Sequence, residues 1–223
     1  MPIKSNENQP NTTDHQATLG LPPQILFIVF TLSGISALIY QLIWQRSLLM
    51  IYGSNIESVT MVVTAFMLGL GLGSLVGGMI SKRQGAPLLL LFALIEISIG
   101  IYGALSLHLF DYVGKMTTGA GTLLTGLLAF ALILIPTMLM GSTLPLLVAH
   151  YVNMTQNVGR SVSMLYFVNT LGAGIGAFVA AFILLGLLGL SGTTYVAVLL
   201  NLTAGGMILY FKSSAPQLDQ HIS

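Results

Sequence analysis

Apolar residues occupy most of the chain in long runs, and polar residues gather at its two ends and in short breaks between the runs. A helix rises about 1.5 Å per residue, so about 20 apolar residues cross the ~30 Å hydrocarbon core of a bilayer. The runs predict an all-α fold, a polytopic membrane bundle with a transmembrane domain over 21–212 between polar tails at 1–20 and 213–223. The six predicted transmembrane helices are 24–45, 58–81, 87–109, 122–151, 161–186 and 191–211.

The helix count depends on two long stretches. Residues 122–151 contain Pro136 and Pro145, which leave pieces too short to cross separately, so we expect the prolines to kink one helix. Residues 161–211 carry no charge and are too long for one crossing. The glycines in 186–192 offer the turn that divides this stretch into two spans.

Composition excludes several classes of protein. Hydrophobic residues make up 55% of the chain and charged residues only 6%, which is too few to cover a soluble domain. The net charge of +1 gives no basic surface for nucleic acid. Because the chain has no cysteine, and its four histidines lack metal-ligand spacing, we predict neither a metal nor a cofactor. The predicted environment is the lipid bilayer.

Lysine and arginine indicate the orientation, because cytoplasmic loops near membrane ends retain them. With six spans and an internal N-terminus, five of the seven basic residues lie inside and two lie outside. The two sets are Lys4, Lys82, Arg83, Arg160 and Lys212 inside, and Arg46 and Lys115 outside. Both termini are therefore predicted to be cytoplasmic.

Small residues recur at helical spacing in the second and fifth spans. Such stripes let helix backbones approach closely in a membrane, where lipid offers little hydrophobic drive for association. They predict either helix packing or an oligomer interface with a second copy or a partner membrane protein. The stripes are Gly69, Gly73 and Gly77, and Gly172, Gly176 and Ala180.

Four segments between about Ser33 and Asn201 resemble the membrane module of bacterial spermidine synthase-like proteins. They read SGISALIYQLIWQRSLLMIYGSN, AFMLGLGLGSLVGG, MGSTLPLLVAHYV and GRSVSMLYFVNTLGAGIGAF. The resemblance implies half of a major facilitator fold, built as a 3+3 helix repeat, in a bacterial inner membrane. Family members commonly join this module to a soluble aminopropyltransferase domain, which has no counterpart here. We therefore expect no enzyme activity from this chain.

The loop between the second and third spans reads GGMISKRQGAP and bears on the major facilitator resemblance. Gly78, Arg83 and Gly85 fit the pattern of that superfamily, but Lys82 stands where an aspartate is expected. The aspartate is linked to gating in the superfamily, so its replacement weighs against active alternating access.

Glu96 lies near the middle of the third span, where a carboxylate costs at least ~2.5 kcal/mol. No lysine or arginine lies inside a span to offset it. We expect a protonated or cation-bound carboxyl, used for proton coupling or for binding a polyamine ammonium group. The alternative is a neutral carboxyl that is hydrogen-bonded across a helix interface.

Polar side chains in two other spans are candidate ligand groups. Gln41 and Gln45 share a face of the first span, with Tyr40 and Trp44 close by and Arg46 following. An interfacial anchor is the alternative for the aromatic and basic residues, whereas a wet cavity or an interhelical hydrogen bond better explains the glutamines.

In the fifth span, Tyr166 and Asn169 lie one turn apart. Asn169 is a candidate hydrogen-bond donor to Glu96 or to a ligand, and its alternative is a structural bond between helices. The same structural interpretation applies to Asn201.

Two functions follow as hypotheses. The first is a transporter-like module for small cations or polyamines, forming half of a twelve-helix carrier. The second is a membrane scaffold that anchors a separately encoded aminopropyltransferase or another partner and moves nothing.

Overall fold

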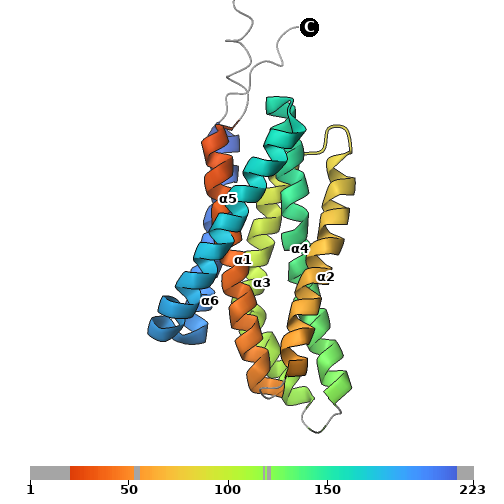
Figure 1. Cartoon of the computed structure of the whole chain (residues 1–223), viewed down its shortest axis with the longest axis vertical. Coiled ribbons are helices and arrows are strands. Elements are labelled where there is room, and N and C mark those ends of the chain that lie inside the picture. The colour runs from red at the N-terminus through yellow and green to blue at the C-terminus, as the bar shows by residue number, and fades with distance from the viewer. Residues whose placement is uncertain (1–20, 53–55, 118, 120–121, 215–223) are drawn as a thin grey trace, which may run out of the picture.

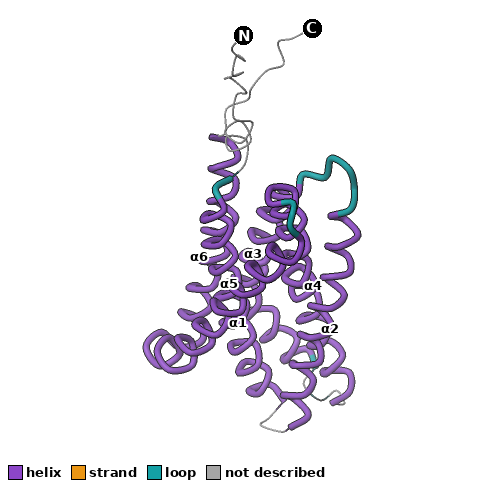
Figure 2. Tube along the Cα trace, turned by 45° about the horizontal axis from the view of Figure 1, so that its top comes forward, coloured by secondary structure: helices purple, strands orange, loops and turns teal. Residues whose placement is uncertain are grey.

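In the computed structural model, the described part of the chain consists of helices joined by short loops (Figure 2). The structure describes residues 21–52, 56–117, 119 and 122–214, so the predicted N-terminal tail and most of the C-terminal tail lie outside the described residues. The elements are α1 (Pro23–Tyr52), α2 (Ile56–Ser81), α3 (Leu88–Met116), α4 (Thr122–Thr155), α5 (Val158–Val179), the π-helical turn η1 (Ala180–Leu184) and α6 (Leu185–Ser214).

Five helical segments among the described residues are long and apolar enough to cross a membrane. Many large apolar side chains point outward, including Met50, Leu123 and Leu187, each at least two-thirds exposed. Such a surface suits lipid and not water. The prediction of a polytopic, all-helical membrane bundle is confirmed at this level. The segments are Pro23–Met50, Val59–Ser81, Leu88–Met116, Leu123–Thr155 and Val158–Ser214.

Four helices extend beyond their predicted ends, and α1, to Tyr52, and α3, to Met116, do so by the most residues. In α3 the added turns carry an ion pair between Lys115 Nζ and Asp111 Oδ2, 2.6 Å apart and four residues apart in sequence. The length of an apolar run indicates only where a helix can leave the hydrocarbon core of the bilayer. The backbone continues as a helix beyond that point as long as its residues favour the helical state.

α4 is one helix that contains both Pro136 and Pro145. Pro136 has no N–H to donate to the carbonyl of Leu132, four residues earlier. The hydroxyl of Tyr102 in α3 donates to that carbonyl at 2.6 Å. A neighbouring helix thus satisfies the acceptor that the proline leaves free, and the helix continues.

The segment from α5 to α6 is interrupted at Gly189, which has φ 65° and ψ −168°. This left-handed backbone conformation favours glycine, and it falls inside the predicted turn at 186–192. The chain changes direction in this region, because α5 descends along α1 and α6 returns along α1 and α3 (Figure 1).

The helices pack mainly in three pairs: α1 with α5, α2 with α4, and α3 with α6. In the α2–α4 pair, a side chain added at Gly73 would meet the backbone of Met138, and one added at Gly77 would meet the backbone of Ser142. Gly69 of the same stripe lies against the side chain of Thr137.

In the α1–α5 pair, Gly172 lies against the Thr31 carbonyl and Gly176 against the Ile35 carbonyl. Gly34 of α1 lies against the Asn169 carbonyl. Helices of the same chain therefore occupy both predicted glycine faces, and a second copy could not reach them without displacing α1 or α4. The expectation that these faces join two copies is wrong for that reason. Ala180 is also fully buried.

An aromatic cluster around Trp44 fills part of the core. Trp44 and Tyr40 are fully buried and stacked with their ring centroids 5.1 Å apart. Phe110 meets Trp44 edge-on at 6.2 Å, and the Trp44 indole N–H donates to Ser106 Oγ at 3.1 Å. The interpretation of Tyr40 and Trp44 as an interfacial anchor is wrong, because the long α1 keeps both rings inside the bundle.

The start of α1 and the end of α6 lie at the same end of the bundle, here called the terminal end (Figure 1). The α2–α3 loop and the α4–α5 turn lie there too, whereas the end of α3 and the start of α4 lie at the opposite, distal end. Lys82 and Arg83 are exposed in the terminal loop, where Gly85 adopts φ 74°.

Candidate functional site

Glu96 is fully buried in α3 and hydrogen-bonded to two other helices. The Ser33 hydroxyl of α1 donates to Glu96 Oε1 at 2.6 Å, and the Asn201 amide of α6 donates to Oε2 at 2.8 Å. No basic side chain pairs with it, because the one ion pair found among the described residues joins Lys115 and Asp111. The site is a buried acid held only by neutral groups.

Close packing of α3 and α6 brings Asn201 to the carboxyl. A side chain added at Gly205 would lie 2.9 Å from the Ala93 carbonyl, so the two backbones approach where glycine allows it. One turn away along α6, the Asn201 Cβ lies 3.5 Å from the position that a Cβ would take at Gly100. Glycines thus flank the Glu96–Asn201 contact on both helices.

The Ser33 hydroxyl suits either state of the acid. It donates to a carboxylate, and it can equally accept a hydrogen bond from a carboxylic acid. Glu96 can therefore gain or lose a proton without losing its link to α1.

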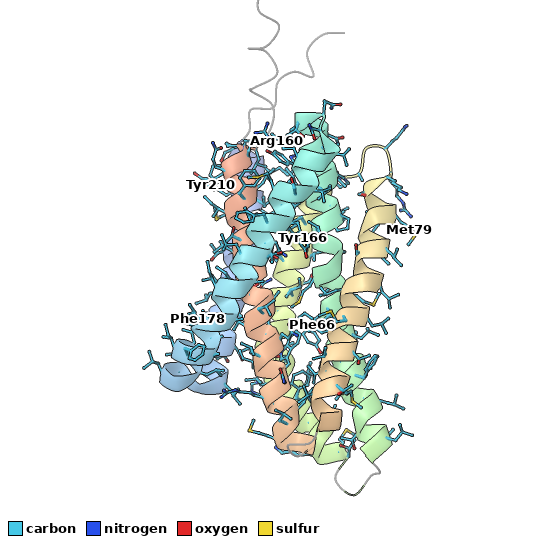
Figure 3. All side chains as sticks on the ribbon, in the orientation of Figure 1. Phe66, Met79, Arg160, Tyr166, Phe178 and Tyr210 are labelled. Carbon is cyan, nitrogen blue, oxygen red and sulfur yellow. The ribbon has the colours of Figure 1, made fainter. Side chains whose placement is uncertain are left out.

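A cavity of about 280 Å³ lies between α1, α2, α4 and α5. Ser33 is in its wall, so Glu96 lies directly behind that wall and is joined to it by the 2.6 Å hydrogen bond. The rest of the lining is mostly apolar, with Phe66 entering between α1 and α2 and Tyr166 on α5 (Figure 3). The other polar side chains in the wall are Ser74, Thr143, Tyr166 and Asn169.

The structure brings some predicted site residues together and separates others. Tyr166 and Asn169 line the cavity with Ser33, but the amide that donates to Glu96 comes from Asn201 and not from Asn169. For Asn201 the structural interpretation, a bond between helices, agrees with this contact.

Gln41 and Gln45 are half-buried further along α1 toward the distal end. They belong neither to the wall of this cavity nor to the hydrogen bonds of Glu96. The loop residues Lys82 and Arg83 likewise lie away from the cavity, at the terminal end.

Ser33 is not among the site residues predicted from the sequence, although the sequence contains a signal for it. Ser33 and Ser36 interrupt an apolar span, and a hydroxyl at such a position needs a partner in hydrocarbon. Four side-chain polar atoms are buried without a partner among the described residues, and two of them, the Tyr40 hydroxyl and the Asn201 Oδ1 atom, lie near α3 and α6.

The chain matches no family model, no curated protein and no solved structure in the comparisons made. Its function is therefore inferred from its own residues and their arrangement.

Proposed function

We propose that this chain is a transporter-like membrane module that binds a small, polyamine-like cation in the cavity between α1, α2, α4 and α5. Glu96 serves as the proton-binding group or as the counter-charge. The observation that carries the proposal is the buried Glu96 carboxyl, which is hydrogen-bonded to the cavity residue Ser33 and has no basic partner. A buried acid in this setting gains from a proton or a bound cation.

Six crossings fit this proposal. The segment Val158–Ser214 has 57 residues, which as one helix would measure about 85 Å, far more than a bilayer core. Its interruption at Gly189 and the return of α6 along α1 support two crossings. An even number of crossings places both termini on one side.

The pairing of helices supports the resemblance to half of a major facilitator fold. If α1–α3 and α4–α6 are equivalent units, exchanging them turns the α1–α5 pair into the α4–α2 pair and leaves the α3–α6 pair unchanged. All three pairs occur, as a 3+3 repeat requires.

Charge supports an orientation with the terminal end in the cytoplasm of a bacterial inner membrane. Lys82, Arg83 and Arg160 lie at the terminal end, whereas at the distal end Lys115 is paired with Asp111. Cytoplasmic ends retain lysine and arginine.

A second copy or a partner membrane protein would complete the cavity. Tyr166 lines it and is 58% exposed, so the cavity reaches the outer surface of the helix pair α1–α5. Polar groups such as Asn169 at this surface are costly against lipid and are better covered by protein.

The test is uptake of labelled spermidine into proteoliposomes. We expect the wild type to take up the label and Glu96→Gln to lose most of it, because glutamine keeps hydrogen bonds but neither charge nor proton exchange. Ser98→Ala is the control, since it removes a polar group from the exposed face of the same helix and lies in neither cavity wall. Uptake that is equal in wild type and Glu96→Gln contradicts the role of Glu96.

A scaffold for a separately encoded aminopropyltransferase or another soluble partner is the second candidate. Lys82 and Arg83 are exposed in a loop that lacks the aspartate expected of a gated carrier, and they suit an acidic partner surface. Absence of uptake by folded wild type, together with partner binding that Lys82→Glu weakens, would favour this function. In neither case is the chain proposed to be an enzyme.

A further inference from the structure

A second cavity, of about 210 Å³, lies between α3 and α6 near the distal end. It is separate from the Ser33 cavity and is more polar, with side chains from both helices in its wall. His108 and Asp111 are exposed, so the cavity opens at the protein surface. Its polar lining residues are His108, Asp111, Ser191, Thr194 and Tyr195.

The same pair of helices holds Glu96 and Asn201. In α3, residues 96, 100, 103, 107 and 111 follow each other at spacings of three or four and therefore share one face. Asp111 and Glu96 are about 22 Å apart along this face, at about 1.5 Å per residue.

In α6, residues 191, 194, 198 and 201 form the matching face. The surface cavity and the buried carboxyl thus lie on one seam, which we call the α3–α6 seam.

The middle of the α3–α6 seam has small residues and unpaired polar atoms. Gly100 and Gly103 contribute no side chain, and the Tyr40 hydroxyl lies against Gly103. This hydroxyl and the Asn201 Oδ1 atom are both buried without a partner among the described residues. Buried polar atoms of this kind are commonly satisfied by ordered water.

We infer that the α3–α6 seam is a water-lined route by which protons reach Glu96 from the distal end. The cavity at His108 and Asp111 is its mouth, and the Tyr40 hydroxyl and the Asn201 amide are intermediate hydrogen-bonding groups. This inference rests on the proposed role of Glu96 in ion movement. A hydronium ion at the mouth passes its proton along hydrogen-bonded water, the Glu96 carboxylate accepts one proton, and water remains.

Few other titratable side chains lie along this route. His108, Asp111 and Tyr195 face the mouth, and Lys115 is paired with Asp111 beside it. Tyr40 lies midway, and only the neutral Ser33 and Asn201 contact Glu96 by hydrogen bonds.

The route is tested by cysteine accessibility, which suits a chain without native cysteine. Thr194→Cys places a thiol in the cavity wall, and Val198→Cys places one a turn deeper on the seam. Leu199→Cys is the control. Leu199 directly follows Val198 in the sequence and is 64% exposed on the outer surface of the bundle. A charged methanethiosulfonate reagent reacts with thiolate, which forms in water and not in hydrocarbon.

With the protein in lipid nanodiscs, we expect Thr194→Cys and Val198→Cys to react at least tenfold faster than Leu199→Cys. Labelling of Thr194→Cys alone would mean that the cavity ends blind and would overturn the route. Equal and slow reaction of all three variants would overturn it as well.

Uptake then tests the Tyr40 hydroxyl. Tyr40→Phe removes only the unpaired oxygen, and we expect a several-fold loss of spermidine uptake. Tyr102→Phe is the control, because that hydroxyl bonds the Leu132 carbonyl outside the α3–α6 seam. Wild-type uptake by Tyr40→Phe would remove Tyr40 from the route.

Cysteine labelling and spermidine uptake test the water route and the proposed function separately. Labelled Val198→Cys without any wild-type uptake would keep the water route and contradict transport. Uptake that depends on Glu96, with Val198→Cys unlabelled, would keep the proposed function and contradict the route.

Discussion

The α2–α4 pair and the α3–α6 pair are both built around glycines, but the glycines meet different kinds of atom. Gly73 and Gly77 of α2 lie against the backbone of α4. Gly100 and Gly103 of α3 lie against side chains, those of Leu202 in α6 and Tyr40 in the adjoining α1. The first pair is therefore fixed by backbone contacts at Gly73 and Gly77. In the second pair the backbone contact at Gly205 is joined by the contacts of Gly100 and Gly103, which side-chain movement can change.

The polar groups follow this difference. Glu96, Asn201 and the unpaired Tyr40 hydroxyl all lie on or beside the α3–α6 seam. A glycine that meets a backbone lets two helices approach closely, whereas Gly103 makes room for the side chain of Tyr40, which carries one of these polar groups. Glycine spacing alone does not separate the two cases.

The largest effect is expected from Gly73→Leu. A leucine there cannot avoid the Met138 backbone, so we expect roughly 3 kcal/mol or more of lost stability, at the upper end for overpacked sites. Thermal unfolding in mild detergent measures it. Gly71→Leu is the control, because no atom lies within 4 Å of a side chain added there. Equal losses for the two variants would contradict the distinction between these glycines.

Glu96→Leu should have an intermediate effect. It leaves the Ser33 hydroxyl and the buried Asn201 amide without their acceptor, which costs about 1–3 kcal/mol. Glu96→Gln retains an acceptor and a donor, and we expect it to cost less than about 1 kcal/mol. Chemical unfolding in detergent compares them, and a Glu96→Leu variant as stable as wild type would show that the hydrogen bonds contribute nothing.

The smallest effect is expected from Gly100→Ala. Its added methyl would lie 3.2 Å from Leu202 Cδ2, and alanine favours the helix by about 1 kcal/mol, so the two effects nearly cancel. Leu202→Ala should remove the remaining cost. The matched pair is Gly73→Ala with Met138→Ala, where truncating the side chain cannot relieve a backbone contact. A double-mutant cycle that shows relief at both sites would contradict the comparison.

The sequence allowed the class of fold to be predicted, because apolar length and turn residues are local properties. The turn at Gly189 and the continuous α4 are examples. The extent of α1 could not be predicted from apolar length, since helical residues continue past Gln45. The anchor interpretation of Trp44 is wrong because the predicted span ends at Gln45, which places Trp44 at a helix end. The local sequence does not distinguish a ring near a helix end from a ring inside a longer helix.

The site could be predicted only in part. A lone acid in an apolar span identifies Glu96 without any structure. Its partners Ser33 and Asn201 lie 63 and 105 residues away, so they depend on which helix faces meet. Gln41 and Gln45 are candidates because they are polar, but polarity within one helix does not reveal which side of the bundle a side chain faces.

The left-handed backbone at Gly189 has a consequence for membrane insertion during synthesis. Between Arg160 and Lys212 the chain carries no charged residue, so no charge in the turn resists passage through hydrocarbon. Neither arm has a charged anchor at the distal end to hold it in place alone. We therefore expect α5 and α6 to enter the bilayer together as a hairpin, once the ribosome has made both arms, and not one helix after the other.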